Sequence, residues 1–150
     1  MIGIIGAMDE EVEQIVAVMD IKKEETKACM TFKAGILAGK DVVIVRSGIG
    51  KVNAAVCTQI LVDDFGVDYV INTGIAGSLR AEIDIADIVI SSDVLHHDMD
   101  ATGFGYPLGQ IPRMDTLSFK ADERLIELAK ESCAKAVASV GVHVGRVVSG

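Results

Sequence analysis

Residues 67–79 read Val-Asp-Tyr-Val-Ile-Asn-Thr-Gly-Ile-Ala-Gly-Ser-Leu, an apolar run that ends abruptly in a glycine-rich loop. Val67–Asn72 has too few polar residues to alternate, which favours a central strand of a parallel sheet covered on both faces. The two glycines and small side chains of the loop 73–78 let a ligand lie against bare backbone. Because ligands in open α/β sheets bind beyond the carboxyl ends of strands, we predict a binding loop here. A tight turn without a ligand is the alternative.

The size and composition of the chain predict one ordinary domain with a large core. It has 150 residues, of which 50% are hydrophobic and only 4% aromatic, so the core must consist mainly of small aliphatic side chains. A net charge of −8 would repel a phosphate backbone, which argues against nucleic acid and anionic membranes as partners. No apolar run approaches a membrane span, and the start lacks the basic segment of a signal peptide, so we expect a cytoplasmic protein.

Three cysteines, Cys29, Cys57 and Cys133, are widely separated and form no Cys-x-x-Cys pair. We therefore predict that they are reduced residues of the core.

The first helix carries a candidate general base. Ile2–Gly6 is typical of a buried strand, and Asp9 is the predicted N-cap of a helix with apolar residues at helical spacing, namely Val12, Ile15, Val16 and Met19. Glu11 falls in the first turn, where the helix dipole favours a negative charge. It is either a common feature of helix starts or a base that faces the cleft.

A hairpin and a second glycine loop follow. Residues 22–27 form a predicted charged connection, and residues 30–37 and 41–46 form two predicted antiparallel strands. The loop 47–51, Ser-Gly-Ile-Gly-Lys, then leads into a helix with Val52, Ala55, Val56, Gln59 and Ile60 at helical spacing.

A strand, a glycine turn and a helix start invite comparison with phosphate-binding loops. A Walker A loop would need glycine at Val45 and Ser or Thr at Val52, and a dinucleotide fingerprint would need glycine or alanine at Asn53. The sequence therefore supports neither an ATPase nor an NAD enzyme.

The last third of the chain combines two strands, a helix and a long loop. We predict strands at residues 85–92 and 142–148, and a helix from an Asp122 cap through Ala138. The loop from His96 to Tyr106 is long enough to serve a function or to cover an interface. Adjacent histidines point apart and no third ligand is spaced for a metal, so we expect no metal site. Because nothing follows the strand that ends at Gly150, we expect an incomplete domain.

Four segments, taken in their order and spacing, resemble the 5′-methylthioadenosine/S-adenosylhomocysteine nucleosidases. They are Ile4–Glu11 (IIGAMDEE), Ser47–Val52 (SGIGKV), Asn72–Gly77 (NTGIAG) and the segment from His97-Asp98 to Phe104-Gly105-Tyr106. The match extends over the whole chain, including residues 119–122 and 148–150. It implies a mixed, largely parallel sheet flanked by helices, in a homodimer that needs no metal or cofactor.

The resemblance also implies residue roles. The carboxylate at Glu11 activates the water that attacks the ribosyl carbon. The resemblance further implies that the ribose and thioalkyl side of the nucleoside is lined by Ala7, Met8 and Ile49, and its purine side by Ile75, Ala76 and Gly77. The positions implied to close the 5′ pocket of a neighbouring subunit are Ala101, Phe104 and Pro112. Ile75 departs from those members that carry serine at this position.

The family's purine-protonating aspartate falls beyond Gly150, so we expect the 150-residue chain alone to have little or no activity. Two alternatives remain. A nucleoside phosphorylase of the same fold would use phosphate as the nucleophile, although Asp9, Glu10 and Glu11 would repel this anion. The second alternative is a non-catalytic module that binds nucleosides or serves in assembly.

Overall fold

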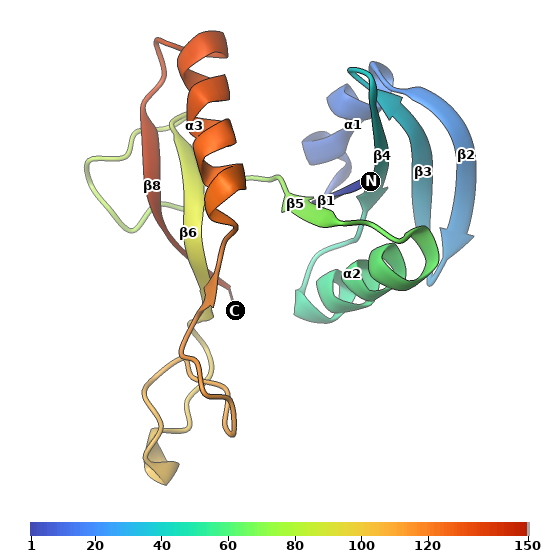
Figure 1. The fold of residues 1–150 in the computed structure, drawn as a ribbon. Helices are drawn as coiled ribbons and strands as arrows, with labels where there is room; N and C mark the ends of the chain where they lie inside the picture. The colour runs from blue at the N-terminus through green and yellow to red at the C-terminus, as the bar shows by residue number, and fades with distance from the viewer. Residues whose placement is uncertain (150) are drawn as a thin grey trace. The chain divides into compact units, whose positions relative to one another are not determined.

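The computed structural model describes residues 1–149, and Gly150, with the predicted end of the domain, lies outside the described residues (Figure 1). The chain divides into two compact units, Met1–Ala76 and a second that begins at Gly77. Each contains a mixed sheet and at least one helix, so the predicted α/β class is confirmed. That residues 1–150 form a single domain stays a prediction.

The first unit is a five-stranded sheet in the order β2-β3-β4-β1-β5. Its strands are β1 (Ile2–Gly6), β2 (Asp20–Lys27), β3 (Met30–Leu37), β4 (Lys40–Arg46) and β5 (Tyr69–Asn72), and its helices are α1 (Asp9–Ala17) and α2 (Lys51–Phe65). β1 pairs in parallel with β4 and β5, whereas β3 pairs antiparallel with β2 and β4. The predicted hairpin of β3 and β4 is confirmed.

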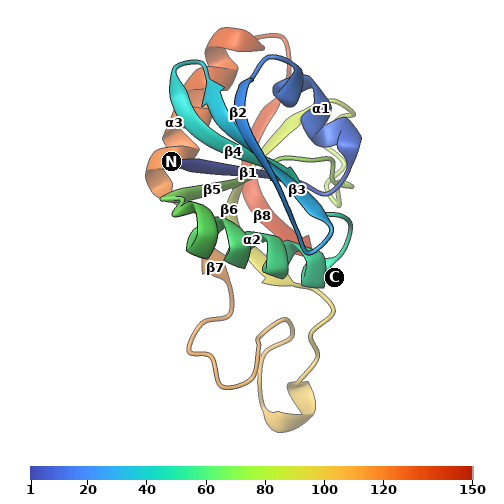
Figure 2. The same ribbon diagram turned by 90° about the vertical axis from the view of Figure 1, so that its right-hand side faces the viewer.

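The two helices pack on opposite faces of this sheet, α1 on one and α2 on the other (Figure 2). Successive side chains of a strand point to opposite faces, so Ile4 packs on the α1 face and Ile5 on the α2 face. The α1 core consists of Ile4, Val12, Met19, Val42 and Ile44. The α2 core consists of Ile5, Met30, Phe32, Val43, Val45, Cys57 and Leu61. Burial on both faces explains the continuous apolar runs of β1 and β4.

Two strand predictions for the first unit are wrong. Residues 22–27 are not a connection but belong to edge strand β2, where charged side chains face water and discourage further pairing. β5 is not central: it pairs only with β1 among the described strands, and Tyr69 and Ile71 are exposed. An apolar run predicts burial but cannot identify the neighbours of a strand.

The packed face of α2 also differs from the prediction. Cys57 and Leu61 are fully buried, whereas Val52 is 78% exposed. Since the apolar residues of α2 are spread around the helix and not confined to one side, its sequence periodicity does not select the packed face.

The second unit is a three-stranded sheet in the order β7-β6-β8. Its elements are β6 (Ile88–His96), a 3₁₀ turn at Thr102–Phe104, β7 (Phe119–Lys120), α3 (Glu123–Ala136) and β8 (Val142–Ser149). β6 pairs in parallel with β8 and antiparallel with β7. The strand predicted at 85–92 begins three residues later and continues through His96. Asp122 caps α3 as predicted, since its carboxylate accepts a hydrogen bond from the Leu125 N–H at 2.9 Å.

All three cysteines are free, but only Cys57 is buried in the core. Cys133 is partly buried, and Cys29 is exposed in the turn between β2 and β3. The prediction of three core thiols is therefore confirmed for Cys57, wrong for Cys29 and only partly met by Cys133. Within residues 1–149, no helix is long and apolar enough to cross a membrane.

Candidate functional site

Three loops of the first unit gather at the carboxyl edge of its sheet. The Ser47 N–H donates to the Gly6 carbonyl at 2.9 Å, which joins the chain after β4 to the end of β1. The Thr73 N–H donates to the Ile5 carbonyl at 2.9 Å, which joins the loop after β5 to the same strand. Parallel strands end at one edge, so the predicted binding loops are neighbours.

Glu11 ties two of these loops together. Its Oε2 accepts hydrogen bonds from the backbone N–H groups of Ala7 at 2.6 Å and Met8 at 3.0 Å. Its Oε1 accepts a third from the N–H of Ile75 at 3.0 Å. The carboxylate therefore points toward the loop after β5.

The start of α1 differs from the prediction. Met8, not Asp9, is the N-cap, and Asp9 is the first helical residue. Glu11 is the third helical residue and reaches back to the N-cap N–H, which is the side-chain half of a capping box. The sequence shows the acidic first turn of the helix. It does not reveal the N-cap, because Met8 caps the helix with its backbone and not with a side chain that is typical of this position.

Two glycines make room for this carboxylate. A Cβ at Gly74 would lie 2.5 Å from Glu11 Oε1, and one at Gly6 would lie 3.0 Å from Glu11 Cβ and 2.6 Å from Val12 Cγ1. Both residues must lack side chains for the two loops to close around Glu11. The sequence suggests a ligand against Gly74, whereas the nearest partner of Gly74 in the structure is this side chain.

The environment keeps Glu11 ionised. Partial burial would raise the pKa of this carboxyl, but the N–H donors of Ile75, Met8 and Ala7 outweigh that effect and lower it below the ordinary value. A carboxylate that accepts backbone hydrogen bonds is favoured in its charged form. Glu11 is thus a preorganised anion at the edge of the sheet.

The other predicted positions of the first unit differ in exposure. Ala7 and Met8 are partly buried beside Glu11, and Ala76 is exposed. Ile49 is 74% exposed on the loop between β4 and α2. These side chains leave apolar surface uncovered at the loops where a nucleoside is expected.

The remaining predicted positions belong to the second unit. Gly77 is exposed at its start. Phe104 is 88% exposed, and Pro112 is also exposed. Ala101 is only 6% exposed, because the 3₁₀ turn folds over it and the N–H groups of Phe104 and Tyr106 bond to its carbonyl. The side chain of Ala101 therefore offers little surface to a partner.

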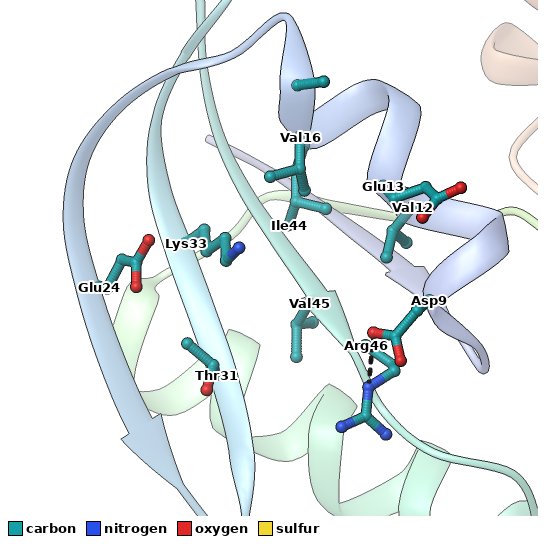
Figure 3. Close-up of a pocket in the computed structure, with 11 residues that line it drawn as sticks. Asp9, Val12, Glu13, Val16, Glu24, Thr31, Lys33, Ile44, Val45 and Arg46 are labelled. Carbon is teal, nitrogen blue, oxygen red and sulfur yellow. Dashed lines mark ion pairs between the residues drawn. The ribbon is translucent and has the colours of Figure 1, made fainter.

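A cavity of about 600 Å³ that the sequence did not predict lies on the α1 face of the first sheet (Figure 3). Its polar lining is of mixed charge, with Lys33 and Arg46 beside Asp9, Glu13 and Glu24. Arg46 Nε forms an ion pair with Asp9 Oδ1 at 2.9 Å. Glu11 does not line this cavity, so the cavity is separate from the carboxylate site.

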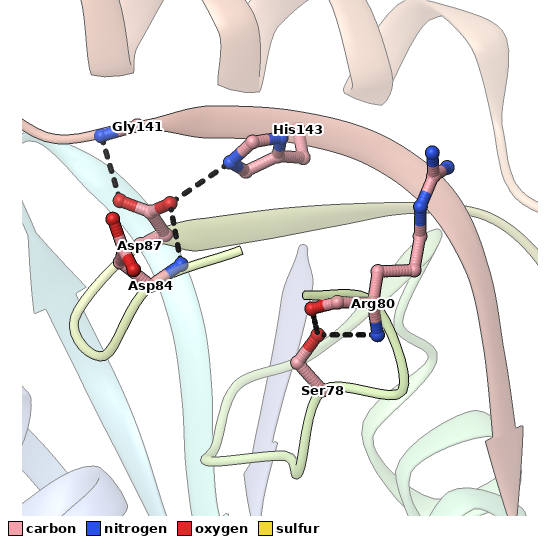
Figure 4. A network of polar contacts seen from close by, with 6 residues as sticks. All are labelled: Ser78, Arg80, Asp84, Asp87, Gly141 and His143. Atoms are coloured by element: carbon pink, nitrogen blue, oxygen red, sulfur yellow. Dashed lines mark hydrogen bonds and ion pairs between the residues drawn. The ribbon is translucent and has the colours of Figure 1, made fainter. Parts of the chain in front are cut away.

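A second polar cluster, also missed from the sequence, lies in the second unit (Figure 4). Asp87 accepts hydrogen bonds from the N–H groups of Asp84 at 3.1 Å and Gly141 at 2.9 Å, and lies 2.9 Å from His143 Nε2. The hydrogen bond to His143 lowers the pKa of Asp87, helped by the N–H of Asp84 and that of Gly141. These contacts fasten the start of β8 to the turn before β6, which is a structural task. Within residues 1–149, no group of three or more His, Cys, Asp or Glu side chains is arranged to hold a metal ion.

The chain is similar to known proteins over nearly its whole length. The family model described as the phosphorylase superfamily matches residues 1–150. A 5′-methylthioadenosine/S-adenosylhomocysteine nucleosidase from Marinomonas sp. (strain MWYL1) is 50% identical over 149 residues, which make up 99% of this chain and 64% of that protein.

Two solved structures carry the same name. The nucleosidase from Neisseria meningitidis, in complex with methylthio-immucillin-A, matches with a TM-score of 0.94 and 42% identity over 99% of this chain and 64% of that one. The nucleosidase from Colwellia psychrerythraea 34H, in complex with adenine, matches with a TM-score of 0.92 and 43% identity over 99% of this chain and 61% of that one. The chain thus spans a little under two thirds of the length of each of these relatives.

Proposed function

Because the chain belongs to the phosphorylase superfamily, we propose that its protein hydrolyses the N-glycosidic bond of 5′-methylthioadenosine and S-adenosylhomocysteine, with Glu11 as the general base. Relatives that bear this name match 99% of the chain at 42% to 50% identity. The observation that carries the proposal is the hydrogen bond between Glu11 Oε1 and the Ile75 N–H, which directs an ionised carboxylate at the predicted nucleoside loop.

The chemistry needs such a group. As the bond between the ribosyl carbon and the purine nitrogen breaks, its electron pair leaves with the purine and the ribosyl carbon becomes positive. A water oxygen bonds to that carbon, its proton passes to the carboxylate, and the purine takes up a proton to leave as adenine. A fixed anion beside the ribose both orients the water and stabilises the positive charge.

The two oxygens of Glu11 are not equivalent. Oε2 already accepts two backbone hydrogen bonds, whereas Oε1 accepts one. A carboxylate oxygen has two lone pairs, so Oε1 keeps room for a water molecule. We assign the contact with the attacking water to Oε1.

Hydrolysis fits the charges better than phosphorolysis. The first turn of α1 presents Asp9, Glu10 and Glu11, which would repel phosphate. Arg46, the basic residue at the end of β4, forms an ion pair with Asp9. The charges on this turn therefore favour water over an anionic nucleophile.

The protein is further proposed to be a homodimer in which Phe104 and Pro112 close the 5′ pocket of the other subunit. Aromatic residues are enriched at protein interfaces, and the 88% exposure of Phe104 leaves its ring available for such a contact. The cytoplasmic location stays a prediction.

Adenine release in phosphate-free buffer tests the proposal. The protein at its natural length is incubated with 5′-methylthioadenosine, and adenine is measured by chromatography with and without added phosphate. We expect equal rates. Release that depends on phosphate would indicate a phosphorylase, and binding of the nucleoside without turnover would indicate a binding module.

A further inference from the structure

Core packing does not hold the exposed part of the loop that carries Ile49. Gly48 and Gly50 adopt φ angles of +83° and +102°, a region that other residues rarely occupy. Ile49, between them, is 74% exposed, so core packing does not hold its side chain. The conformation of this loop must therefore depend on polar contacts.

Ser47 anchors the first side of the loop. It is 5% exposed, its N–H donates to the Gly6 carbonyl at 2.9 Å, and its hydroxyl donates to the Gly48 carbonyl at 2.9 Å. These bonds fix the chain as it leaves β4 but do not reach Ile49.

Asn53 anchors the second side. Its Nδ2 donates to the Ile49 carbonyl at 2.8 Å. The regular ladder of α2 begins one residue later, with the Ala54 N–H bonded to the Gly50 carbonyl at 3.1 Å. The Ile49 carbonyl therefore lies outside the ladder, and the Asn53 amide is the partner that ties it to α2.

The same amide also lies against the flanking glycine. A Cβ at Gly48 would come within 3.1 Å of Asn53 Nδ2. The Asn53 amide thus bonds to the Ile49 carbonyl and also occupies the space that a side chain at position 48 would need.

We propose that Asn53 is a positioning residue that holds Ile49 in the conformation that contacts the ribose and 5′-thioalkyl part of the nucleoside. This inference rests on the proposed function. A loop that occupies its binding conformation only part of the time weakens affinity by that fraction. A neutral hydrogen bond stabilises one conformation enough to change a population by about three- to tenfold. Only ligands that reach Ile49 should sense the loss.

The test compares three proteins at their natural length: wild type, Asn53→Ala and Asn53→Ser. Alanine removes the donor. Serine restores one, because a helical hydroxyl can donate to the carbonyl four residues earlier. Thr58 does so to Ala54 at 2.8 Å and Ser132 to Leu128 at 2.7 Å in this chain.

Calorimetry measures the Kd of each protein for adenine and for a non-hydrolysable methylthioadenosine analogue. For Asn53→Ala we expect the Kd for the analogue to rise about three- to tenfold and the Kd for adenine to stay unchanged. In turnover assays we expect a higher KM, with kcat within about twofold of wild type. Asn53→Ser should return the Kd for the analogue to within about twofold of wild type.

An unchanged Kd for the analogue in Asn53→Ala, or equal weakening for both ligands, would overturn the assignment of Asn53 while leaving the nucleosidase proposal intact. If wild type bound neither ligand, both would fail. The two failures are therefore distinguishable.

Discussion

A single methyl group at Gly74 should disable the site by displacing the Glu11 carboxylate. In Gly74→Ala the new Cβ would lie 2.5 Å from Glu11 Oε1 and 2.9 Å from Glu11 Cδ. To reach an ordinary contact of 3.4 Å, the oxygen must retreat by roughly 0.9 Å. That movement lengthens or breaks its 3.0 Å hydrogen bond to the Ile75 N–H.

The expected cost follows from the displacement of the base. A misplacement of about 1 Å lowers a rate by on the order of a hundredfold. Complete loss of a general base costs about a hundred- to ten-thousand-fold. We therefore expect kcat/KM of Gly74→Ala to fall by at least about a hundredfold and to approach that of Glu11→Gln.

The assay is adenine release by proteins at their natural length, with thermal unfolding measured in parallel. Gly145→Ala is the matched control, because a Cβ at Gly145 meets no atom within 4 Å and the residue lies in β8, outside the predicted binding loops. It should keep wild-type activity. Near-wild-type activity of Gly74→Ala would refute the idea that the Glu11 carboxylate must be held in this position.

Three further predictions concern titration. Because the pKa of Glu11 is lowered, its charge is present above the ordinary value of 4.5 and is lost only as the pH falls through the lowered pKa. An acid limb of kcat/KM that is centred above pH 4.5 and is absent in Glu11→Gln would contradict this. Burial raises the pKa of the Cys57 thiol to about 11, so alkylation at neutral pH should label the exposed Cys29 first, as mass spectrometry can show. Equal labelling of Cys57 in the native protein would show that Cys57 is not buried. The Arg146 guanidinium lowers the pKa of Asp93 to about 2, so Asp93→Asn should lower the Tm at neutral pH. The difference in Tm between this variant and wild type should shrink as the pH falls from 3.8 toward 2. A difference in Tm that does not change with pH would argue against this ion pair.

Local chemistry made much of the fold predictable. The strand Ile2–Gly6, the hairpin of β3 and β4 and the Asp122 cap follow from apolar runs, a glycine turn and a capping carboxylate. These features depend on neighbours in the sequence. Features that depend on distant neighbours were missed, such as the edge position of β5.

The sequence predicts which residues form the candidate site but not the contacts that hold them together. Glu11 and the loop 72–77 were identified because each lies in a short continuous motif, Ile4–Glu11 and Asn72–Gly77. The three donors to the carboxylate are backbone N–H groups, which every residue but proline possesses, so side-chain identity could not reveal them. The roles of Gly74 and Asn53 likewise emerge only when the loops are brought together.

A crystal structure of the natural-length protein with a non-hydrolysable methylthioadenosine analogue tests the central claim most directly. We expect a water molecule about 2.6–3.2 Å from Glu11 Oε1, on the side of the ribose opposite the purine and facing the ribosyl carbon. A ribose bound away from the Glu11 carboxylate, or a carboxylate turned from the Ile75 N–H into solvent, would contradict it.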